Sequence, residues 1–495
     1  MRTVTGPTDR VVVVGAGLGG LSAALRLAAA GREVTVLERA DVPGGRAGVL
    51  HADGYTFDTG PTVLTMPGLI ADALAAVDER LEDWLDLRRL DPAYRAWFPD
   101  GSTLDVHADV DAMAAEVSRV CGPAEADGYR RFVAYAAQLY RLEMADFIER
   151  NLDSPFDLVT PNLGRLVAMG GFRRLSTVAH RFLADPRTRR VFTFQSMYAG
   201  LPPHRALALY AVIAYMDTVA GVYFPVGGMH AVPQGLAGAA AKHGVTFRYG
   251  TEVVDVETSG DRAQAVRTAD GDRVPCDVLV LNPDLPVARS RLLGHPLRRP
   301  VRYSPSCFLL LAGSRARYRR IAHHNVHVGR AWHRTFHEVV DAGRLMSDPS
   351  FLVSSATRTD ASLAPEGRAT YSALFPTPNL RAPLDWTRRR GPYRDEVVGT
   401  LERAGYVGFD DAVEVESVTT PLDWQARGMA AGTPFALAHT FGQSGPFRPR
   451  NVWGENVVFT GSGTQPGVGV PMVLLSGRLA AERVTGPPRR AGRQR

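Results

Sequence analysis

Hydrophobic positions near the start of the chain change their spacing twice over a short stretch. Val11 to Val14 is a β-branched run, and Leu21 to Ala30 has the spacing of a helix that ends at Gly31. Val34 to Leu37 is a second apolar run with the composition of a buried strand. This order predicts a strand, helix and strand of a parallel α/β sheet.

The middle of the chain follows a helical period, from about Asp109 to Met216. One face carries Tyr129, Phe132, Val133, Ala136, Leu139, Tyr140, Met144, Phe147 and Ile148. This pattern predicts an all-helical insertion. A later part of it is apolar nearly all round, which suits either a helix buried in the core or one facing an apolar channel; it contains Leu207, Leu209, Tyr210, Val212, Ile213, Tyr215 and Met216.

Strand-like runs return after the helical part, separated by turn residues. They are Val245 to Tyr249, Glu252 to Thr258, Ala263 to Thr268 and Val278 to Leu281. A mixed region of strands and helices follows to about Arg427. A strand at Val457 to Thr460, a glycine loop and a helix at Pro471 to Val484 are then expected, and the Pro- and Arg-rich residues Gly486 to Arg495 are expected to be disordered.

Length and composition describe a folded protein with room for a large ligand. With 495 residues the chain exceeds what one hydrophobic core usually supports, so two or three domains are expected. Cys121, Cys276 and Cys307 have no C-x-x-C spacing and suit free thiols in a reducing compartment. No signal peptide is evident, and the most apolar runs are too short to cross a bilayer, so a cytoplasmic location is expected.

The charge changes this picture little. The formal net charge is +6, with 57 basic residues among which Lys242 is the only lysine. A basic protein can bind nucleic acid or anionic lipid, but no block of Lys and Arg typical of a nucleic-acid site occurs in the body of the chain. The charge pattern therefore argues against a nucleic-acid partner.

The first candidate site is a glycine loop between the first strand and helix. Gly15-Ala16-Gly17-Leu18-Gly19-Gly20 fits G-x-G-x-x-G, in which bare glycines let backbone N–H groups approach a pyrophosphate. Glu38 ends the second strand, where its carboxylate can accept hydrogen bonds from ribose hydroxyls. Strand, loop, helix and acidic residue together predict a Rossmann-type dinucleotide site.

Two following segments favour FAD over NAD. Pro43-Gly44-Gly45-Arg46 lets the backbone pass close to a cofactor while the guanidinium meets phosphate or flavin oxygens, and Asp58-Thr59-Gly60-Pro61-Thr62 comes shortly after. Near the other end, Gly461-Ser462-Gly463-Thr464 and Gly467-Val468-Gly469-Val470-Pro471 lead into the last helix. The N-terminus of that helix would stabilise negative charge on a flavin ring. The cofactor-binding set is Gly15, Ala16, Gly17, Gly19, Gly20, Glu38, Arg39, Gly45, Arg46, Gly60, Pro61, Thr62, Val253, Gly461, Ser462, Gly469, Val470 and Pro471.

These motifs, with others between them, resemble the bacterial phytoene desaturases over most of the chain. The shared segments are the glycine loop, Gly44-Gly45-Arg46, Phe194-Gln195-Ser196, Phe224-Pro225 with Gly227-Gly228, Ser362 to Gly367, Leu422-Asp423-Trp424, Phe447-Arg448-Pro449 and the terminal glycines. The resemblance implies FAD, no tightly bound metal, a long polyene hydrocarbon as substrate, and a membrane surface as partner. It also implies a peripheral place on the inner face of the cell membrane. The electron acceptor stays open between a quinone and oxygen.

The fold expected is α/β, in three parts. A Rossmann-type FAD-binding domain is assembled from both ends of the chain, over 10–72, 225–285 and 440–485. A substrate domain with a mixed sheet covers 73–106 and 286–439. The helical insertion, 107–224, is expected to form a substrate tunnel or a membrane contact.

The reaction expected is FAD-dependent desaturation, most simply of phytoene towards lycopene, with hydride transfer to the flavin N5 atom and loss of a proton to a weak base. Asp217 is one candidate base, against the commoner interpretation of a surface or helix-end charge. No catalytic residue is assigned. Many relatives have His where this chain has Gln465, so no role is transferred to that position.

Alternatives stay open at this stage. They are carotenoid isomerisation, oxidation of a terminal carbon, desaturation of a shorter polyene, an unrelated flavin oxidase of amines or porphyrinogens, and a non-catalytic carrier of prenylated or carotenoid cargo. His323, His324, His327, His333 and His337 cluster in sequence but lack the accompanying carboxylates, so no metal site is expected. Anionic lipid or plain solvation explains Arg173, Arg174, Arg181, Arg187, Arg189 and Arg190 equally well.

Overall fold

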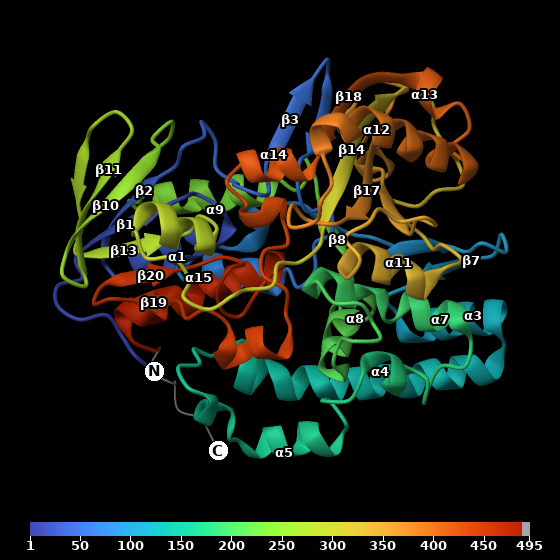
Figure 1. Ribbon diagram of the computed structural model, residues 1–495, viewed down its shortest axis with the longest axis horizontal. Coiled ribbons are helices and arrows are strands. Elements are labelled where there is room, and N and C mark those ends of the chain that lie inside the picture. The colour runs from blue at the N-terminus through green and yellow to red at the C-terminus, as the bar shows by residue number, and fades with distance from the viewer. Residues whose placement is uncertain (488–495) are drawn as a thin grey trace.

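A six-stranded sheet forms one end of the molecule in the computed structural model, which describes residues 1–487 (Figure 1). The sheet has the order β19-β20-β13-β1-β2-β9 and is parallel except at β19. The last eight residues of the expected disordered tail, 488–495, lie outside the described part. The strands are β1 (Arg10–Val14), β2 (Glu33–Leu37), β9 (Thr246–Arg248), β13 (Val278–Leu281), β19 (Val452–Trp453) and β20 (Val457–Phe459).

Both faces of this sheet are covered, which explains why β1 is an unbroken apolar run. Val11 and Val13 face one hydrophobic cluster, and Val12 and Val14 face another on the opposite side. Parallel sheets are buried on both faces for this reason. The second cluster lies beneath a three-stranded antiparallel sheet made by β10 (Val253–Ser259), β11 (Arg262–Thr268) and β12 (Arg273–Pro275).

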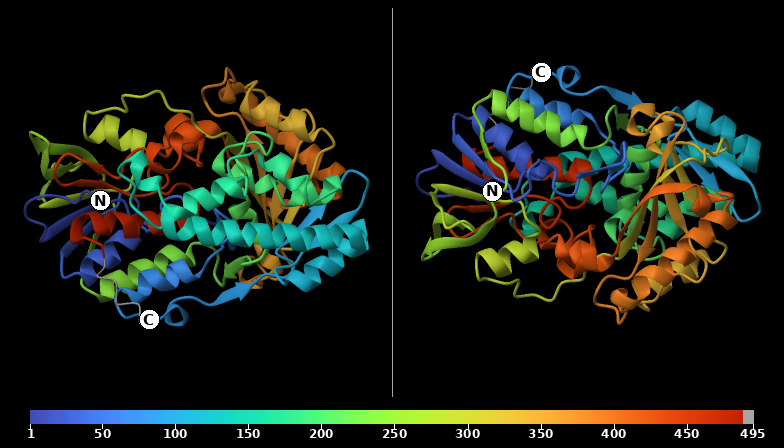
Figure 2. Two further views of the ribbon diagram at one scale, coloured as in Figure 1. Left: turned by 90° about the horizontal axis from the view of Figure 1, so that it is seen from below. Right: turned by 90° about the horizontal axis from the view of Figure 1, so that it is seen from above.

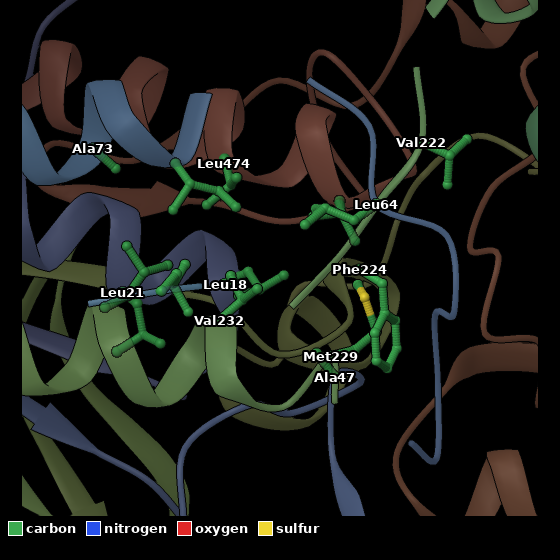
Figure 3. Packing of buried hydrophobic residues seen from close by; sticks show 14 of the residues in the cluster. Leu18, Leu21, Ala47, Leu64, Ala73, Val222, Phe224, Met229, Val232 and Leu474 are labelled. Atoms are coloured by element: carbon green, nitrogen blue, oxygen red, sulfur yellow. The ribbon is translucent and has the colours of Figure 1, made fainter. Parts of the chain in front are cut away.

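The first cluster, which continues into the helical insertion, includes residues of α1 (Leu18–Ala29), α2 (Gly68–Ala75), α9 (Ala231–Lys242) and α15 (Val470–Thr485). Figure 3 shows Leu21 of α1, Val232 of α9 and Leu474 of α15 in this packing. The backbones of α1 and α15 lie close together, and Gly477 permits this approach: a Cβ at that position would lie 2.5 Å from the Gly19 carbonyl oxygen. Two segments far apart in sequence therefore form one side of the domain.

The helix α1 begins at Leu18, three residues earlier than its hydrophobic spacing suggests. Gly17 caps it, and the Leu21 amide already donates to the Gly17 carbonyl over 2.9 Å. Gly19 and Gly20 are thus part of the first turn rather than of a preceding loop. The other expected strands and the last helix end within two residues of their predicted bounds.

A seven-stranded mixed sheet forms the other end of the molecule, with the order β18-β14-β17-β16-β15-β6-β7. A separate hydrophobic cluster on this sheet contains residues of α11, α12 and α13, and α13 lies beside α12 (Figure 1). The strands are β6 (Tyr94–Trp97), β7 (Thr103–Val106), β14 (Ser306–Ser314), β15 (His324–His327), β16 (Phe351–Ser354), β17 (Ala369–Thr377) and β18 (Val413–Thr419), and the helices are α11 (Trp332–Val340), α12 (Trp386–Arg403) and α13 (Phe409–Ala412).

The helical insertion runs along one side of both ends, and Figure 2 shows its longest helix, α4, crossing the molecule from below. Gly122 and Pro123 separate α3 from α4, and Pro starts a helix well because its missing N–H would be unpaired there. The helices are α3 (Val110–Cys121), α4 (Pro123–Glu143), α5 (Pro161–Ala168), α6 (Leu175–Ala179), α7 (Pro186–Val191) and α8 (Ala211–Thr218).

Short elements join the three parts. Two antiparallel ribbons are formed by β3 (Val49–Ala52) with β4 (Tyr55–Asp58), and by β5 (Leu87–Arg89) with β8 (Tyr223–Pro225). Two further short helices are α10 (Leu285–Val287) and α14 (Pro421–Ala426). The α/β fold with a mixed second sheet is as expected, while the bounds assigned to each domain stay a prediction. Within residues 1–487, no helix combines the length and apolar character needed to cross a bilayer.

Candidate functional site

The glycine loop between β1 and α1 has no room for side chains. A Cβ on Gly20 would lie 2.2 Å from the Gly15 carbonyl oxygen, and one on Gly17 would lie 2.7 Å from Nδ2 of Asn282. Gly15 has a φ of +97°, a conformation that side chains disfavour. Only glycines therefore allow β1, α1 and β13 to meet this closely.

Glu38 connects this loop to the end of β2. Its side chain is 7% exposed, and its two carboxylate oxygens accept from the Ala16 amide at 2.7 Å and the Ala40 amide at 2.9 Å. A carboxylate with two backbone donors is held firmly in one orientation. Glu38 thus lies beside the loop, as its predicted role with a ribose requires.

The second motif packs directly on the first. The Gly44 amide donates to the Ala16 carbonyl at 2.9 Å, and Gly45 has a φ of +56°. A Cβ on Gly60 would lie 1.8 Å from the Arg46 carbonyl oxygen, which explains a glycine at that position as well. The two halves of the predicted site are therefore in contact through backbone atoms.

Arg46 joins this motif to the terminal glycine segment. Its guanidinium donates to Ser462 Oγ and forms an ion pair with Asp284 at 3.1 Å. Arg448, 1% exposed, donates to the carbonyls of Ser462 at 2.6 Å and Thr464 at 2.8 Å. The Phe447-Arg448-Pro449 segment therefore holds the terminal glycines in place. Burial lowers the pKa of Arg448 to about 10, so it keeps its charge at neutral pH.

One cavity of about 1060 Å³ collects the predicted cofactor residues. All of them line it except Ala16 and Gly20, which belong to the glycine loop but are buried behind its cavity-facing residues. Arg39 donates to the Arg427 carbonyl at its edge, and Val253 contributes from the start of β10. The volume matches the upper end of the range found for ligand pockets.

Sequence analysis missed Asn282 and Asp284, which line the same cavity. Asn282 lies between the two glycine motifs, and its Nδ2 donates to the Gly15 carbonyl at 3.3 Å. The signal was available, because both residues follow the apolar strand β13, and ligands bind at the carboxyl ends of parallel strands.

The helical insertion forms the opposite part of the cavity wall. Of the seven large apolar residues named between Leu207 and Met216, six line the cavity; the seventh, Tyr215, packs its ring against Tyr140 at a centroid distance of 5.0 Å. This segment therefore faces a channel, and full burial in a core does not describe it. The wall on this side includes Phe147, Ile148, Leu158, Leu163, Leu166, Leu207, Leu209, Tyr210, Val212, Ile213 and Met216.

Gln465, which stands where many relatives have His, has a structural role. Its amide nitrogen donates to the carbonyls of Leu152 at 2.8 Å and Gly445 at 3.1 Å, and its oxygen accepts from the Leu152 amide at 3.0 Å. All these bonds hold the backbone of the cavity wall. Both N–H groups and the oxygen of the Gln465 amide are therefore paired with backbone groups.

The histidine cluster divides between two elements. At the start of β15, His323 just before the strand and His324 within it pair through Nδ1 with Thr359 at 2.7 Å and Ser354 at 2.8 Å. Burial lowers the pKa of His323 to about 3. His333 and His337 lie on α11 instead. Within residues 1–487, no three His, Cys, Asp or Glu side chains gather as the ligands of a metal ion would.

The arginines of the insertion fall into two groups, those with partly buried side chains and those with exposed ones. Arg187 pairs with Asp185 at 2.7 Å, Arg189 donates to the Ala184 carbonyl at 2.6 Å, and Arg190 lies over the Trp332 ring at 5.7 Å. Arg173, Arg174 and Arg181 are exposed. Arg174 also donates to the Arg205 carbonyl at 2.6 Å, so four of the six candidate lipid-binding arginines make contacts within the protein.

The cavity fits FAD. Its cofactor side presents bare backbone at Gly17, Gly45 and Gly461, a fixed carboxylate at Glu38, and the N-terminus of the 16-residue helix α15 at Gly469. Phosphate groups bind such backbone and helix ends, and the positive end of a helix dipole stabilises an electron-rich ring. The opposite side is apolar, as a hydrocarbon substrate requires.

Comparison with known proteins gives the same result. Residues 18–485 match the model of the family "Flavin containing amine oxidoreductase". The chain is 57% identical to a phytoene dehydrogenase of Streptomyces griseus, covering 98% of this chain and 97% of the relative. It is 39% identical to a zeta-carotene-forming phytoene desaturase of Myxococcus xanthus, covering 96% and 93%.

A lycopene-forming phytoene desaturase of Pseudescherichia vulneris is 32% identical, over 95% of this chain and 98% of the relative. Among solved structures, a triple mutant of putrescine oxidase superposes with a TM-score of 0.60 at 18% identity, covering 96% of this chain and 99% of that one. At that identity the superposition establishes the fold alone. The chain is an FAD-dependent oxidoreductase that acts on CH–CH groups of a hydrophobic polyene, and it belongs to the bacterial phytoene desaturases within the flavin-containing amine oxidoreductase family.

Proposed function

We propose that this enzyme desaturates phytoene towards lycopene. The observation that carries the proposal is a single cavity with two kinds of wall, glycine backbone on one side and apolar side chains of the helical insertion on the other. The named relatives convert phytoene to different products, so the number of steps is the finer part of the proposal.

A polyene offers no polar group, so its affinity comes from buried apolar area, at about 25 cal/mol per Å². Ile213, Met216 and Leu209 give this area on the insertion side, and Cys307, Leu309 and Leu374 add to it from the seven-stranded sheet. Apart from a few groups such as Glu143 and Asp217, this wall is apolar, so a hydrocarbon can slide along it. Successive CH–CH units can therefore reach the same position.

When bound, FAD supplies the two-electron acceptor, because its N5 atom accepts a hydride. We propose that Glu38 holds the ribose and that the backbone of Gly17 and Gly45 holds the pyrophosphate. The N-terminus of α15 at Val470 and Pro471 would face the electron-rich edge of the ring. All eighteen cofactor residues predicted from sequence enter this proposal unchanged. The reduced cofactor would pass its electrons to a quinone or to oxygen.

We also propose that the open end of the cavity rests on a membrane with anionic lipid. Phe156, Val159 and Phe441 are 84%, 74% and 62% exposed, while neighbouring Leu158 and Phe447 line the cavity. The segment Gly445–Phe447 packs against Pro155–Leu158, so these side chains belong to one surface. Helix α5 lies at the same edge of the molecule (Figure 1).

Charge supports lipid as the occupant of this surface. Arg165 on α5 and Arg173, Arg174 and Arg181 beyond it are exposed. Arginines beside exposed aromatic residues are typical of proteins that lie in the interface of a bilayer. A hydrocarbon substrate dissolved in the membrane would then enter the cavity without crossing water.

The assay that tests the function combines the FAD-loaded protein, liposomes containing phytoene, and a quinone under anaerobic conditions. We expect visible bands at successively longer wavelengths as double bonds are added, and the extracted products count the steps. A flavin-loaded protein that leaves phytoene unchanged with fresh lipid and acceptor would refute the substrate assignment.

Liposome flotation tests the membrane surface. Replacing Phe156 and Phe441 with Ser should reduce binding to anionic liposomes by at least tenfold, because burying each Phe contributes about 1.5–3 kcal/mol. Val407→Ser is the matched control, since Val407 is 75% exposed in the connection between α12 and α13, away from this surface. Equal flotation of the two variants would refute this surface.

A further inference from the structure

Asp217 lies in the wall of the apolar cavity, near the end of α8. It is 3% exposed, and its neighbours in the wall include Ile213, Met216 and Tyr198. Burying a carboxylate among apolar groups costs free energy unless a partner compensates it. An acidic residue at this place therefore needs an explanation beyond packing, and it is not the surface charge that its sequence context favours.

The partner of Asp217 is a tyrosine behind the wall. Tyr94 on β6 is 1% exposed, and its hydroxyl donates to an Asp217 carboxylate oxygen at 3.2 Å. The Tyr94 ring packs on His324 at a centroid distance of 5.6 Å and on Phe194 at 6.1 Å. Tyr94 is thereby fixed, and it holds one oxygen of Asp217 while the carboxyl group stays at the cavity wall.

Two other buried carboxylates of the chain have partners that explain them. Asp284 pairs with Arg46 at 3.1 Å, and Glu125 accepts from the Ala184 amide at 3.0 Å and from the Thr188 hydroxyl. Within residues 1–487, Asp217 forms no ion pair at all. The fold therefore keeps a carboxyl group without a cation beside the place where the substrate would lie.

Glu143, at the end of α4, is the other buried carboxyl in this part of the wall. Its Oε1 has no hydrogen-bond partner, and burial raises its pKa well above the usual value. Burial raises the pKa of Asp217 only to about 7, because the Tyr94 hydrogen bond opposes the effect. Tyr94 and Tyr198, which face Asp217 from β6 and the segment Phe194–Ala199, have raised pKa values too. Of the two carboxyl groups, Asp217 is the one with a hydrogen-bonding partner, and its pKa lies near neutral pH.

We propose that the carboxylate of Asp217 is the base that removes the proton during desaturation, with Tyr94 as its positioning residue. The proposal rests on the function proposed above. Desaturation takes a hydride with its electron pair from one carbon, and this pair goes to the FAD acceptor. Asp217 takes the proton from the adjacent carbon, and the electrons of that C–H bond form the new double bond. The neutral carboxyl then releases its proton before the next step.

Apolar surroundings suit this role. A base is most effective when its pKa lies near the working pH, and general-base catalysis typically contributes 10²–10⁴-fold to a rate. A weak base is sufficient, because loss of the hydride leaves positive charge delocalised over the polyene and acidifies the adjacent C–H bond. The negative carboxylate would also stabilise this charge.

The test compares FAD-loaded wild type, Asp217→Asn, Asp217→Glu and Glu125→Gln. Single-turnover bleaching of the flavin by phytoene in liposomes is followed without oxygen. We expect flavin bleaching in Asp217→Asn to be slower by at least about 100-fold. The FAD content of this variant and the amount of phytoene that it extracts from the liposomes should equal those of wild type. Asp217→Glu should recover part of the rate with a shifted pH profile. Glu125→Gln, a buried acid of the same insertion outside the cavity, should stay within about twofold.

Infrared titration gives a readout that does not depend on turnover. Wild type should show a carboxyl band that disappears as the pH rises through about 7, and Asp217→Asn should lack it. Wild type that phytoene does not bleach would refute the proposed function, whereas bleaching at equal rates in wild type and Asp217→Asn would refute the role of Asp217. If Asp217→Asn fails to bind FAD, Asp217→Glu decides: a wild-type rate and pH profile would overturn the role.

Discussion

The two walls of the cavity are built from different materials. The cofactor side consists of backbone, and at Gly20, Gly45 and Gly60 a side chain would collide with the chain or meet an unfavourable φ. The insertion side consists of apolar side chains such as Ile213 and Met216, which other apolar residues of similar volume can replace. Backbone approach demands one residue type, whereas apolar volume accepts several. Substitutions on the cofactor side should therefore cause loss of FAD. Substitutions on the insertion side should instead change the affinity for the substrate.

The largest effect is expected from Gly20→Ala on the cofactor side. The added methyl would lie 2.2 Å from the Gly15 carbonyl oxygen, which is backbone and has little freedom to move. We expect loss of FAD from the purified protein and a fall in its melting temperature. The control is Gly164→Ala on α5, where the added methyl meets no atom within 4 Å. Full FAD content in Gly20→Ala would contradict the proposed rigidity of the loop.

Asp217 and Glu143 are the two buried carboxyl groups on the insertion side, and removal of Asp217 should stabilise the protein at high pH. Its pKa is raised from 3.8 to about 7, so the folded state disfavours the carboxylate and wild type loses stability as the pH rises between these values. Asp217→Asn lacks this loss. It should exceed wild type by up to about 4 kcal/mol in unfolding free energy at pH 8, and the advantage should disappear towards pH 4. Urea titrations at both pH values measure it, and an equal gain at both would contradict the interpretation.

A smaller effect is expected from Glu38→Gln. The amide would place an N–H group against the amide of Ala16 or Ala40, both of which now donate to the carboxylate. Such a mismatch costs about 1–3 kcal/mol, so FAD should bind about 10- to 100-fold more weakly. Titration of the apoprotein with FAD measures this, with Glu33→Gln at the exposed start of β2 as control. Unchanged affinity would remove Glu38 from the site.

The smallest effect is expected from Ile213→Ala on the insertion side. Loss of part of the apolar wall should raise KM for phytoene about tenfold, corresponding to about 1.4 kcal/mol, with FAD content unchanged. Ile213→Leu keeps the volume and should stay within about twofold. If Ile213→Ala lost FAD instead, the separation of the two walls would be wrong.

The same difference explains what could be predicted from sequence. Glycines at the ends of strands carry a specific signal, so the cofactor motifs were identified, and the α/β fold, the FAD cofactor and the family are confirmed. The segment around Ile213 was ambiguous, because core packing and a channel select the same residues. Asp217 was ambiguous because its partner Tyr94 is more than a hundred residues away.

Asn282 and Gln465 show a second limit. Each acts through hydrogen bonds to backbone groups that are distant in sequence, Gly15 in one case and Leu152 in the other. The place of Asn282 after β13 indicates that it lies at the site, but neither residue type indicates these particular contacts. Their roles became visible only when the chain was folded.

The contact between α1 and α15 has a consequence for how the protein is made. The hydroxyl of Ser22 donates to the carbonyl of Leu474, 452 residues later. At about 5–20 residues per second, a ribosome needs about 20 to 90 s to travel between them. During that time β1, α1 and the glycine loop exist without the helix that covers them. The cofactor site is thus completed only at a late stage of translation, and its first half is exposed to chaperones until then.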